Sequence, residues 1–277
     1  MEWNKTICGD NLLAMKDFID QGCTFDLCLT DPPYGLDKDF GNDSDNPLKL
    51  RDFLQPRISL LEKLIATNGS CLWFCSQQYI YHVMSTFDQE STLWYKRMMM
   101  WYYRNGMSRQ ETSPITEFEP FLWYTQDQKA WTYNRDDVRV PYKSDRVKTP
   151  VYKKNKNGEV KAWNPDPRGA KRGDVWECPC LAGKLYENER TEHPTQKPEK
   201  LITELIKAFC PKGADGKYEG SILDPFHGSG TLGVCCESLN LQGHRIKWIG
   251  IELERRWVDE GDRRIAEIKA KADDYIL

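Results

Sequence analysis

The stretch that decides the fold is Ile222-Leu223-Asp224-Pro225-Phe226-His227-Gly228-Ser229-Gly230-Thr231. It runs from an apolar strand through a glycine-rich turn into a helix. Glycines let the backbone pass close beneath a ligand, and the first turn of a helix presents free N–H groups to an anion. The spacing is neither the G-x-G-x-x-G of dinucleotide-binding turns nor the Gly-Lys-Ser/Thr of a P-loop. The stretch therefore predicts a ligand-binding turn of another kind.

The segments around this turn alternate between helix and strand. In chain order we predict a helix over Pro198–Phe209, a strand over Ser221–Phe226, a helix over Thr231–Leu239, a strand over Ile246–Glu252 and an amphipathic helix over Arg256–Lys271. Such alternation predicts a doubly wound α/β sheet. Glu252 follows Asp224 by 28 residues, at the end of the next strand. An acid there suits the two hydroxyls of a ribose, so turn and acid together predict a nucleoside site.

The N-terminal part also alternates between strand and helix. Phe25–Thr30 reads as a buried strand, Leu50–Ala66 as a helix that ends at Asn68-Gly69, and Ser70–Cys75 as the next strand. Two β-rich runs follow, Arg97–Tyr103 and Phe121–Thr125, with little helix between them. We therefore expect an antiparallel addition to the parallel sheet.

Leu29-Thr30-Asp31-Pro32-Pro33-Tyr34 lies where the first predicted strand ends, and open α/β sheets bind ligands at that edge. The Asp31 carboxylate and the Pro32 carbonyl can accept hydrogen bonds from the exocyclic amine of a base, which frees the nitrogen lone pair to attack a methyl group. Two successive prolines stiffen this backbone. Tyr34 offers a flat face to a base that has left its stack. An ordinary turn after a strand stays as the alternative interpretation.

His193-Pro194-Thr195-Gln196-Lys197-Pro198 precedes a predicted helix. Thr195 and Lys197 suit a ligand carboxylate. A loop with a threonine cap and a proline near the first helical turn explains the same residues, and the spacing alone favours it.

The middle of the chain, 127–189, is polar and only weakly periodic. Between Lys129 and Asp174 there are thirteen Lys and Arg residues against six Asp and Glu, although the whole chain has a net charge of −3. A solvated surface and a phosphate-contacting face both explain such a segment.

The ten cysteines follow neither a paired C-x2-C zinc pattern nor a secreted disulfide pattern, so we expect reduced, mostly buried thiols and no metal site. We find no apolar run of membrane-spanning length and no signal-peptide pattern at Met1–Lys5. The sequence therefore predicts a cytoplasmic protein without a membrane partner.

Taken together, the chain resembles the beta class of DNA amino-methyltransferases, in which a catalytic tetrapeptide precedes the cofactor-binding half. The resemblance covers residues 5–125 and 172–270, and it depends on the common order of short motifs. These are Cys8-Gly9-Asp10-Asn11-Leu12, Asp31-Pro32-Pro33-Tyr34, Gly173-Asp174-Val175-Trp176, His193-Pro194-Thr195-Gln196-Lys197-Pro198, Asp224–Thr231 and Gly250-Ile251-Glu252. Leu232 departs from the Thr or Ala that the family often has there, which alters packing beneath the cofactor.

The resemblance implies a circularly permuted, mostly parallel sheet of seven strands, with S-adenosylmethionine as cofactor. Residues 1–128 would form the catalytic half, 129–189 a target-recognition insert and 190–277 the cofactor-binding half. The tetrapeptide Asp31, Pro32, Pro33 and Tyr34 would be catalytic, with Asp31 also beside the cofactor. Asp224, Phe226, Gly228 and Gly230 would cradle the cofactor, Glu252 would bind its ribose, Asp10 its adenine, and Thr195 and Lys197 its methionine carboxylate.

The implied activity is methylation of double-stranded DNA at the N6 amine of a flipped-out adenine. Members that begin the tetrapeptide with Asp mostly resemble adenine-N6 enzymes, and those with Ser mostly cytosine-N4 enzymes. Cytosine-N4 methylation and a catalytically silent DNA-binding protein stay as alternatives, whereas RNA and protein-amide enzymes typically begin the motif with Asn. The resemblance allows a homodimer and a cognate restriction enzyme as partners, and the sequence decides neither.

Overall fold

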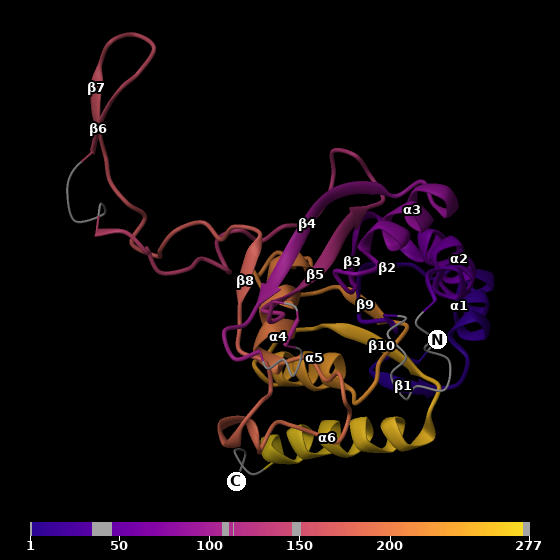
Figure 1. Ribbon diagram of the computed structural model, residues 1–277. Helices are drawn as coiled ribbons and strands as arrows, with labels where there is room; N and C mark the ends of the chain where they lie inside the picture. The colour runs from indigo at the N-terminus through magenta and orange to yellow at the C-terminus, as the bar shows by residue number, and fades with distance from the viewer. Residues whose placement is uncertain (1, 35–45, 107–110, 113, 146–150, 274–277) are drawn as a thin grey trace.

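A computed structural model describes residues 2–34, 46–106, 111–112, 114–145 and 151–273. Its centre is a sheet of eight strands in the order β1-β10-β9-β2-β3-β5-β4-β8 (Figure 1). These are β1 (Lys5–Cys8), β2 (Phe25–Thr30), β3 (Ile65–Phe74), β4 (Trp94–Tyr102), β5 (Phe118–Thr125), β8 (Val175–Glu177), β9 (Ser221–Asp224) and β10 (Lys247–Glu252). A separate hairpin consists of β6 (Val151–Lys154) and β7 (Val160–Trp163).

Five of the seven neighbouring strand pairs are parallel, which confirms the predicted mostly parallel sheet. The two antiparallel pairs join β5 to β3 and to β4, so the predicted antiparallel addition is also present. The sheet has one strand more than the seven expected. The additional strand is β8, which comes from the end of the weakly periodic middle segment and pairs with β4.

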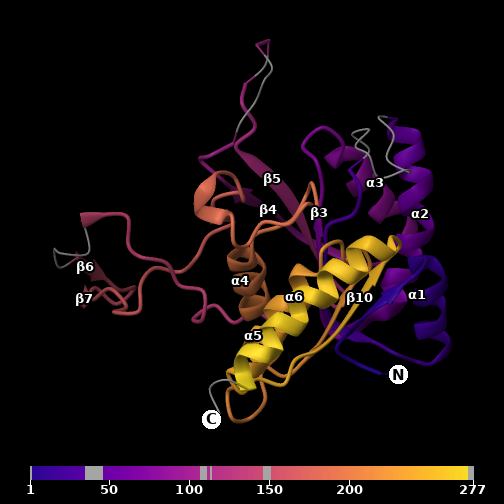
Figure 2. The same ribbon diagram turned by 90° about the horizontal axis from the view of Figure 1, so that it is seen from below.

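Helices cover both faces of the sheet (Figure 2). One layer contains α1 (Asn11–Asp20), α2 (Pro47–Leu64) and α3 (Ile80–Glu90), and the other contains α4 (Glu199–Phe209), α5 (Thr231–Leu241) and α6 (Arg255–Asp273). Side chains of β3 alternate between the layers: Leu72 and Phe74 pack toward α4 and α5, whereas Cys71 and Trp73 pack toward α1–α3. In the described ranges, no helix has the length and apolar character needed to cross a membrane.

The junction between α2 and β3 differs from the prediction. The helix ends at Leu64, and Asn68 and Gly69 lie inside β3 instead of terminating the helix. Ile65 already has extended backbone angles and pairs with Phe25 of β2. Pairing along the sheet therefore outweighs the local preference of Asn-Gly for a turn.

All ten cysteines are free thiols, and seven of them are buried. Burial raises the pKa of Cys235 and of Cys210 to about 12, so both stay protonated at neutral pH. Protonated thiols are poor nucleophiles and poor metal ligands. Among the described residues, no group of three or more His, Cys, Asp or Glu side chains is arranged to hold a metal ion.

The middle segment leaves the body of the protein and returns to it. Its ends meet at a neck, where Val140 and Ala170 exchange two backbone hydrogen bonds of 3.0 and 2.7 Å. Gly169 in this neck has φ +110°, and a Cβ there would lie 2.4 Å from the Val140 carbonyl oxygen, so the position requires glycine. Beyond the neck, the hairpin β6–β7 projects away from the sheet (Figures 1 and 2).

Candidate active site

A cleft that is open to solvent lies at the carboxyl ends of β2, β9 and β10. The strand order reverses there, because the chain moves outward from β2 to β3 and in the opposite direction from β9 to β10. Doubly wound sheets bind their ligands at such a reversal. Eleven of the twelve residues singled out in the sequence line this cleft, and the twelfth, Gly230, lies between the lining residues Ser229 and Thr231.

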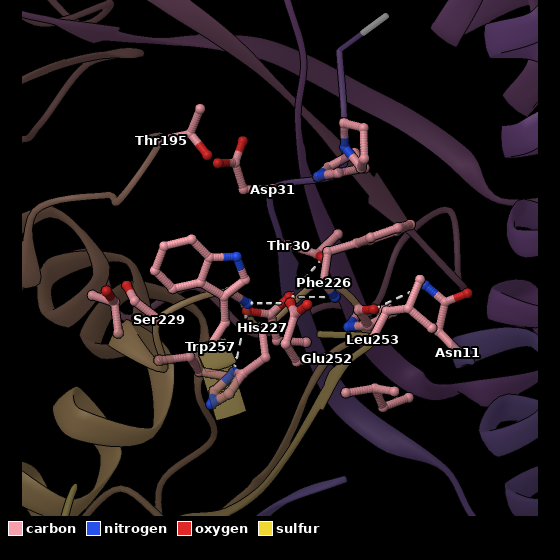
Figure 3. Close-up of a pocket in the computed structure, with 18 of the residues that line it drawn as sticks. Asn11, Thr30, Asp31, Thr195, Phe226, His227, Ser229, Glu252, Leu253 and Trp257 are labelled. Carbon is pink, nitrogen blue, oxygen red and sulfur yellow. Dashed lines mark hydrogen bonds and ion pairs between the residues drawn. The ribbon is translucent and has the colours of Figure 1, made fainter. Parts of the chain in front are cut away.

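Asp224 anchors the glycine-rich turn to the neighbouring strand. Its Oδ1 accepts hydrogen bonds from the Thr30 hydroxyl at 2.7 Å and from the backbone N–H of Phe226 at 3.1 Å (Figure 3). Both Asp224 and Thr30 are buried. Because Thr30 directly precedes Asp31, this contact fixes the tetrapeptide and the glycine-rich turn relative to each other.

Helix α6 also packs against the glycine-rich turn. Gly230 has φ +79°, and a Cβ there would lie 2.7 Å from the Cα atom of Gly261. Buried Arg264 donates a hydrogen bond to the Ser229 carbonyl at 2.6 Å and pairs with Glu199 at 2.8 Å. Arg264 was not predicted from the sequence as part of the site. The available signal was its place on the apolar face of α6, at helical spacing from Trp257 and Gly261.

Glu252 lies at the end of β10 and faces the turn. Its Oε2 accepts the backbone N–H of Gly228 and its Oε1 accepts that of Glu254, both at 2.9 Å. Burial raises its pKa above the usual range. The carboxylate is thus held in one orientation by two backbone groups, with lone pairs left for a ligand.

Residues at the start of α1 border the same part of the cleft. Asp10 caps the helix by accepting the Leu12 N–H at 2.8 Å. Asn11 donates to the Pro225 carbonyl at 2.9 Å and accepts from Arg57 Nε at 2.9 Å. The N-terminus of the chain is therefore tied to the glycine-rich turn by a buried side chain.

Aromatic rings supply the apolar part of the cleft. The Phe226 ring packs on Trp73, with centroids 6.2 Å apart, and Trp257 packs edge-on against His193 at 4.7 Å. In the view of Figure 3, Glu252 lies between the Trp257 indole and the Phe226 ring. Burial lowers the pKa of His193 to about 4, so this imidazole is neutral at neutral pH. The cleft thus combines flat apolar surfaces with one oriented carboxylate.

Asp31 is in contact with a buried ammonium group. Lys197 Nζ lies 2.5 Å from Asp31 Oδ2 and 3.1 Å from Oε2 of Glu119 on β5. The Tyr34 hydroxyl donates to Asp31 Oδ1 at 2.5 Å and lies 3.0 Å from Glu119 Oε2. Glu119 is a second residue that the sequence analysis missed, since no motif marks it and only the strand register brings it here.

Burial and charge act against each other in this group. Burial raises the pKa of Asp31, the Lys197 ammonium lowers it, and Glu119 raises it again, with a net increase. Burial alone would lower the pKa of Lys197, but the two carboxylates outweigh burial and raise it. Lys197 therefore stays charged and opposes protonation of Asp31.

Thr195 and Lys197 were predicted to bind a ligand carboxylate together. Both line the cleft, and in Figure 3 the Thr195 hydroxyl points toward the Asp31 carboxylate. The Lys197 ammonium is directed to Asp31 and Glu119 instead of to open space. The structure brings the two residues together, and their role toward a ligand stays a prediction.

A family model described as DNA methylase (N6_N4_Mtase) matches residues 25–263. Type II methyltransferase M.HpaI of Haemophilus parainfluenzae is 30% identical over 265 residues, which cover 94% of this chain and 74% of that protein. DNA adenine methyltransferase YhdJ of Escherichia coli (strain K12) is 28% identical over 267 residues, which cover 94% and 82%.

Two solved structures share the fold. The crystal structure of the M1.HpyAVI-SAM complex superposes with a TM-score of 0.61 at 24% identity and covers 94% of this chain and 98% of that chain. PvuII DNA methyltransferase (cytosine-N4-specific) superposes with a TM-score of 0.65 at 14% identity and covers 97% and 90%. The family match spans most of the sheet and all the residues that line the cleft except Gly9, Asp10 and Asn11. The chain therefore belongs to the N6/N4 family of DNA methylases and is a site-specific DNA methyltransferase.

Proposed function

We propose that this enzyme transfers a methyl group from S-adenosylmethionine to the N6 amine of an adenine in double-stranded DNA. The observation that carries the proposal is the position of Asp31, whose carboxylate lines the same cleft as the glycine-rich turn and Glu252. One cleft thus offers a hydrogen-bond acceptor for a base amine and a set of groups suited to a nucleoside cofactor.

The cofactor side of the cleft fits S-adenosylmethionine. Glu252 is already oriented by two backbone N–H groups and can accept two further hydrogen bonds from ribose hydroxyls. Gly228 and Gly230 bring the backbone close to the ligand, and Phe226 and Asp10 both line the cleft that would receive the adenine. When bound, the cofactor supplies an electrophilic sulfonium methyl group. Its presence as the natural ligand is supported by the SAM complex of M1.HpyAVI, which has the same fold.

The base side of the cleft is the tetrapeptide. Asp31 and the Pro32 carbonyl accept the two hydrogen bonds of the target amine, and the Tyr34 ring stacks on the flipped base. Pro32 and Pro33 restrict the backbone, so the carbonyl keeps its direction. Positioning and electrostatics supply the rate acceleration, and no covalent intermediate on the enzyme is needed.

The insert 129–189 is the proposed DNA-recognition region. Lys153 and Lys161 lie directly opposite each other on β6 and β7, and Lys154 follows on β6. All three are exposed. Like charges opposite each other destabilise a hairpin, and DNA phosphates would neutralise them. Their arrangement thus favours an anionic partner over a merely solvated surface.

Adenine is favoured over cytosine as the target base. Asp31 opens the tetrapeptide, as in the members that resemble adenine-N6 enzymes, and YhdJ is named a DNA adenine methyltransferase. PvuII methyltransferase, which is cytosine-N4-specific, shares the fold at a lower identity. Cytosine N4 is therefore the second candidate.

The partners beyond DNA stay proposals. M.HpaI is named a type II methyltransferase, which supports a cognate restriction enzyme that cleaves the unmethylated sequence. A homodimer is the other predicted partner, and sedimentation of the purified protein with and without DNA tests it.

The proposed reaction is tested by incubating the enzyme with unmodified genomic DNA and methyl-labelled cofactor. The DNA is then digested to nucleosides, which are separated and identified by mass. We expect labelled N6-methyl-2′-deoxyadenosine. Labelled N4-methyl-2′-deoxycytidine would establish the second candidate. The absence of any labelled nucleoside would reject both candidates.

A further inference from the structure

The group formed by Asp31, Tyr34, Glu119 and Lys197 contains more interactions than the proposed transfer uses. The Lys197 side chain is only 6% exposed and lies between two carboxylates. The rings of Tyr34, Phe74 and Trp101 surround its ammonium at 5.3, 5.2 and 5.6 Å. A charge buried in this way loses solvation free energy, which only well-placed partners offset. We therefore expect this arrangement to have a function.

Both oxygens of Asp31 are already engaged. Oδ2 contacts Lys197, and Oδ1 accepts the Tyr34 hydroxyl. A target amine needs an acceptor on this carboxylate. Tyr34 has a second acceptor within reach, because Glu119 Oε2 lies 3.0 Å from its oxygen. The tyrosine can therefore turn its proton from Asp31 to Glu119 while its oxygen stays in place.

We propose that Glu119 is a positioning residue that accepts the Tyr34 hydroxyl when the target amine takes Asp31 Oδ1, while Lys197 holds Asp31 as a carboxylate through Oδ2. The inference rests on the proposed methyl transfer. It gives the two charged neighbours of Asp31 separate tasks: Lys197 keeps Asp31 ionised, and Glu119 frees an acceptor oxygen of Asp31 by accepting the Tyr34 hydroxyl.

The two charged side chains around Asp31 shift its pKa in opposite directions. Lys197 lowers the pKa of Asp31, whereas Glu119 raises it. The other titratable groups near the cluster are neutral at neutral pH: burial raises the pKa of Tyr34, Cys75, Tyr103 and Cys180, and lowers that of His193 to about 4. Among the described residues, Lys197 and Glu119 are thus the charged neighbours of Asp31. Removing the charge of Lys197 must therefore raise the pKa of Asp31, and removing the charge of Glu119 must lower it.

The first experiment titrates Asp31 in the protein without ligands. Carboxyl-¹³C-labelled aspartate reports each side chain by NMR, and Asp31→Asn assigns the signal. We expect Lys197→Met to raise the pKa of Asp31 and Glu119→Gln to lower it, each by about one unit or more. Lys197→Arg keeps the charge and should stay near the wild type. Glu117→Gln, on an exposed residue two positions before Glu119, is the matched control.

The second experiment measures kcat for methyl transfer against pH with the same variants. The acidic limb should move to higher pH in Lys197→Met and to lower pH in Glu119→Gln. Glu119→Ala also removes the acceptor, so it should lower kcat about tenfold without raising the KM for DNA. In a Tyr34→Phe background there is no hydroxyl for Glu119 to accept. Glu119→Ala should then lower kcat only slightly.

Shifts of the same sign, absent shifts, or full additivity of Glu119→Ala with Tyr34→Phe would overturn the inference. Thermal unfolding of each variant separates these results from a loss of folding, and Lys197→Arg gives a charged variant if Lys197→Met unfolds. A wild-type enzyme that methylates no DNA would reject the proposed function. The NMR titrations need no activity and would still decide whether Lys197 and Glu119 set the charge of Asp31.

Discussion

In the cleft, several contacts join side chains that are far apart in the sequence, whereas the side-chain contact described in the β6–β7 hairpin joins close neighbours. Asp31 contacts Lys197 across 166 residues, and Thr30 contacts Asp224 across 194. In the hairpin, Asn155 bonds Glu159 four residues away, and the strand residues are exposed. A site for chemistry needs preset geometry, whereas the hairpin, which is proposed to contact DNA, can tolerate local change. Substitutions in the two regions should therefore have separable effects.

The largest expected effect is that of Asp31→Ala in the cleft. Without the carboxylate the target amine loses an acceptor, so kcat should fall about 10²- to 10³-fold. The Kd for S-adenosylmethionine should change little, because Glu252 and the glycine-rich turn stay intact. Single-turnover kinetics and calorimetry measure the two quantities. Asp20→Ala, at an exposed position on α1, is the control. Near-normal turnover with unchanged cofactor affinity would show that the assignment of Asp31 is wrong.

Glu252→Ala should weaken cofactor binding while leaving DNA affinity unchanged. Hydrogen bonds to a charged group contribute about 1.5–3 kcal/mol each, so the loss predicts a Kd about 10- to 100-fold higher. Calorimetric titration with the cofactor checks this. Glu254→Ala is the matched control, since that carboxylate pairs with Arg256 at 2.7 Å. Equal losses in both variants would argue against a ribose site at Glu252.

The triple change Lys153→Gln, Lys154→Gln and Lys161→Gln should affect DNA binding alone. We expect affinity about tenfold lower at moderate salt. The slope of log K against log salt should become shallower by about 0.9 for every lysine that contacts a phosphate. Fluorescence anisotropy over a range of salt concentrations measures both. Lys16, Lys49 and Lys63, exposed on α1 and α2, provide a control triple. An unchanged slope would remove the hairpin from the proposed DNA contact.

The last prediction concerns the stability of the fold in acid, which is independent of catalysis and of DNA binding. The pKa of His193 is about 4 in the fold and about 6.5 in an unfolded chain. Between these values the unfolded state binds a proton that the folded state does not, so stability falls as the pH drops from 6.5 to 4. His193→Gln should reduce this loss by about 2–3 kcal/mol, measured as the free energy of unfolding in urea at pH 7 and pH 4.5. His82→Gln, outside the cleft, should keep the wild-type loss.

The parts of the fold with strong local signals were predictable. Strand β2 was predicted at Phe25–Thr30, its observed bounds, because burial on both faces gives a mostly apolar run, which only Asp26 interrupts. The predicted glycine-rich turn lies between β9 and α5, where positive φ at Gly228 and Gly230 leaves little choice of residue. Helix α3 was not predicted, and its first turn lacks a side-chain cap.

The contacts that complete the cleft were not predictable from local pattern. Glu119 reaches Tyr34 only because β5 inserts between β3 and β4, and Arg264 reaches the glycine-rich turn only because α6 packs beneath it. Lys197 was found in a motif, but its contact with Asp31 depends on how α4 docks on the sheet. Motifs mark the residues that meet a ligand, whereas their supporting partners follow from tertiary packing.

The neck at Val140 and Ala170 has a consequence for how this enzyme can change. Because the two ends of the loop are fastened to each other, β8 keeps its pairing with β4 whatever length of chain lies between them. Each doubling of such a loop costs only about 0.6 kcal/mol of closure entropy. The neck therefore allows the chain beyond it to change in length without altering the pairing of β8 with β4, which suits the role proposed above for the insert 129–189 in DNA recognition.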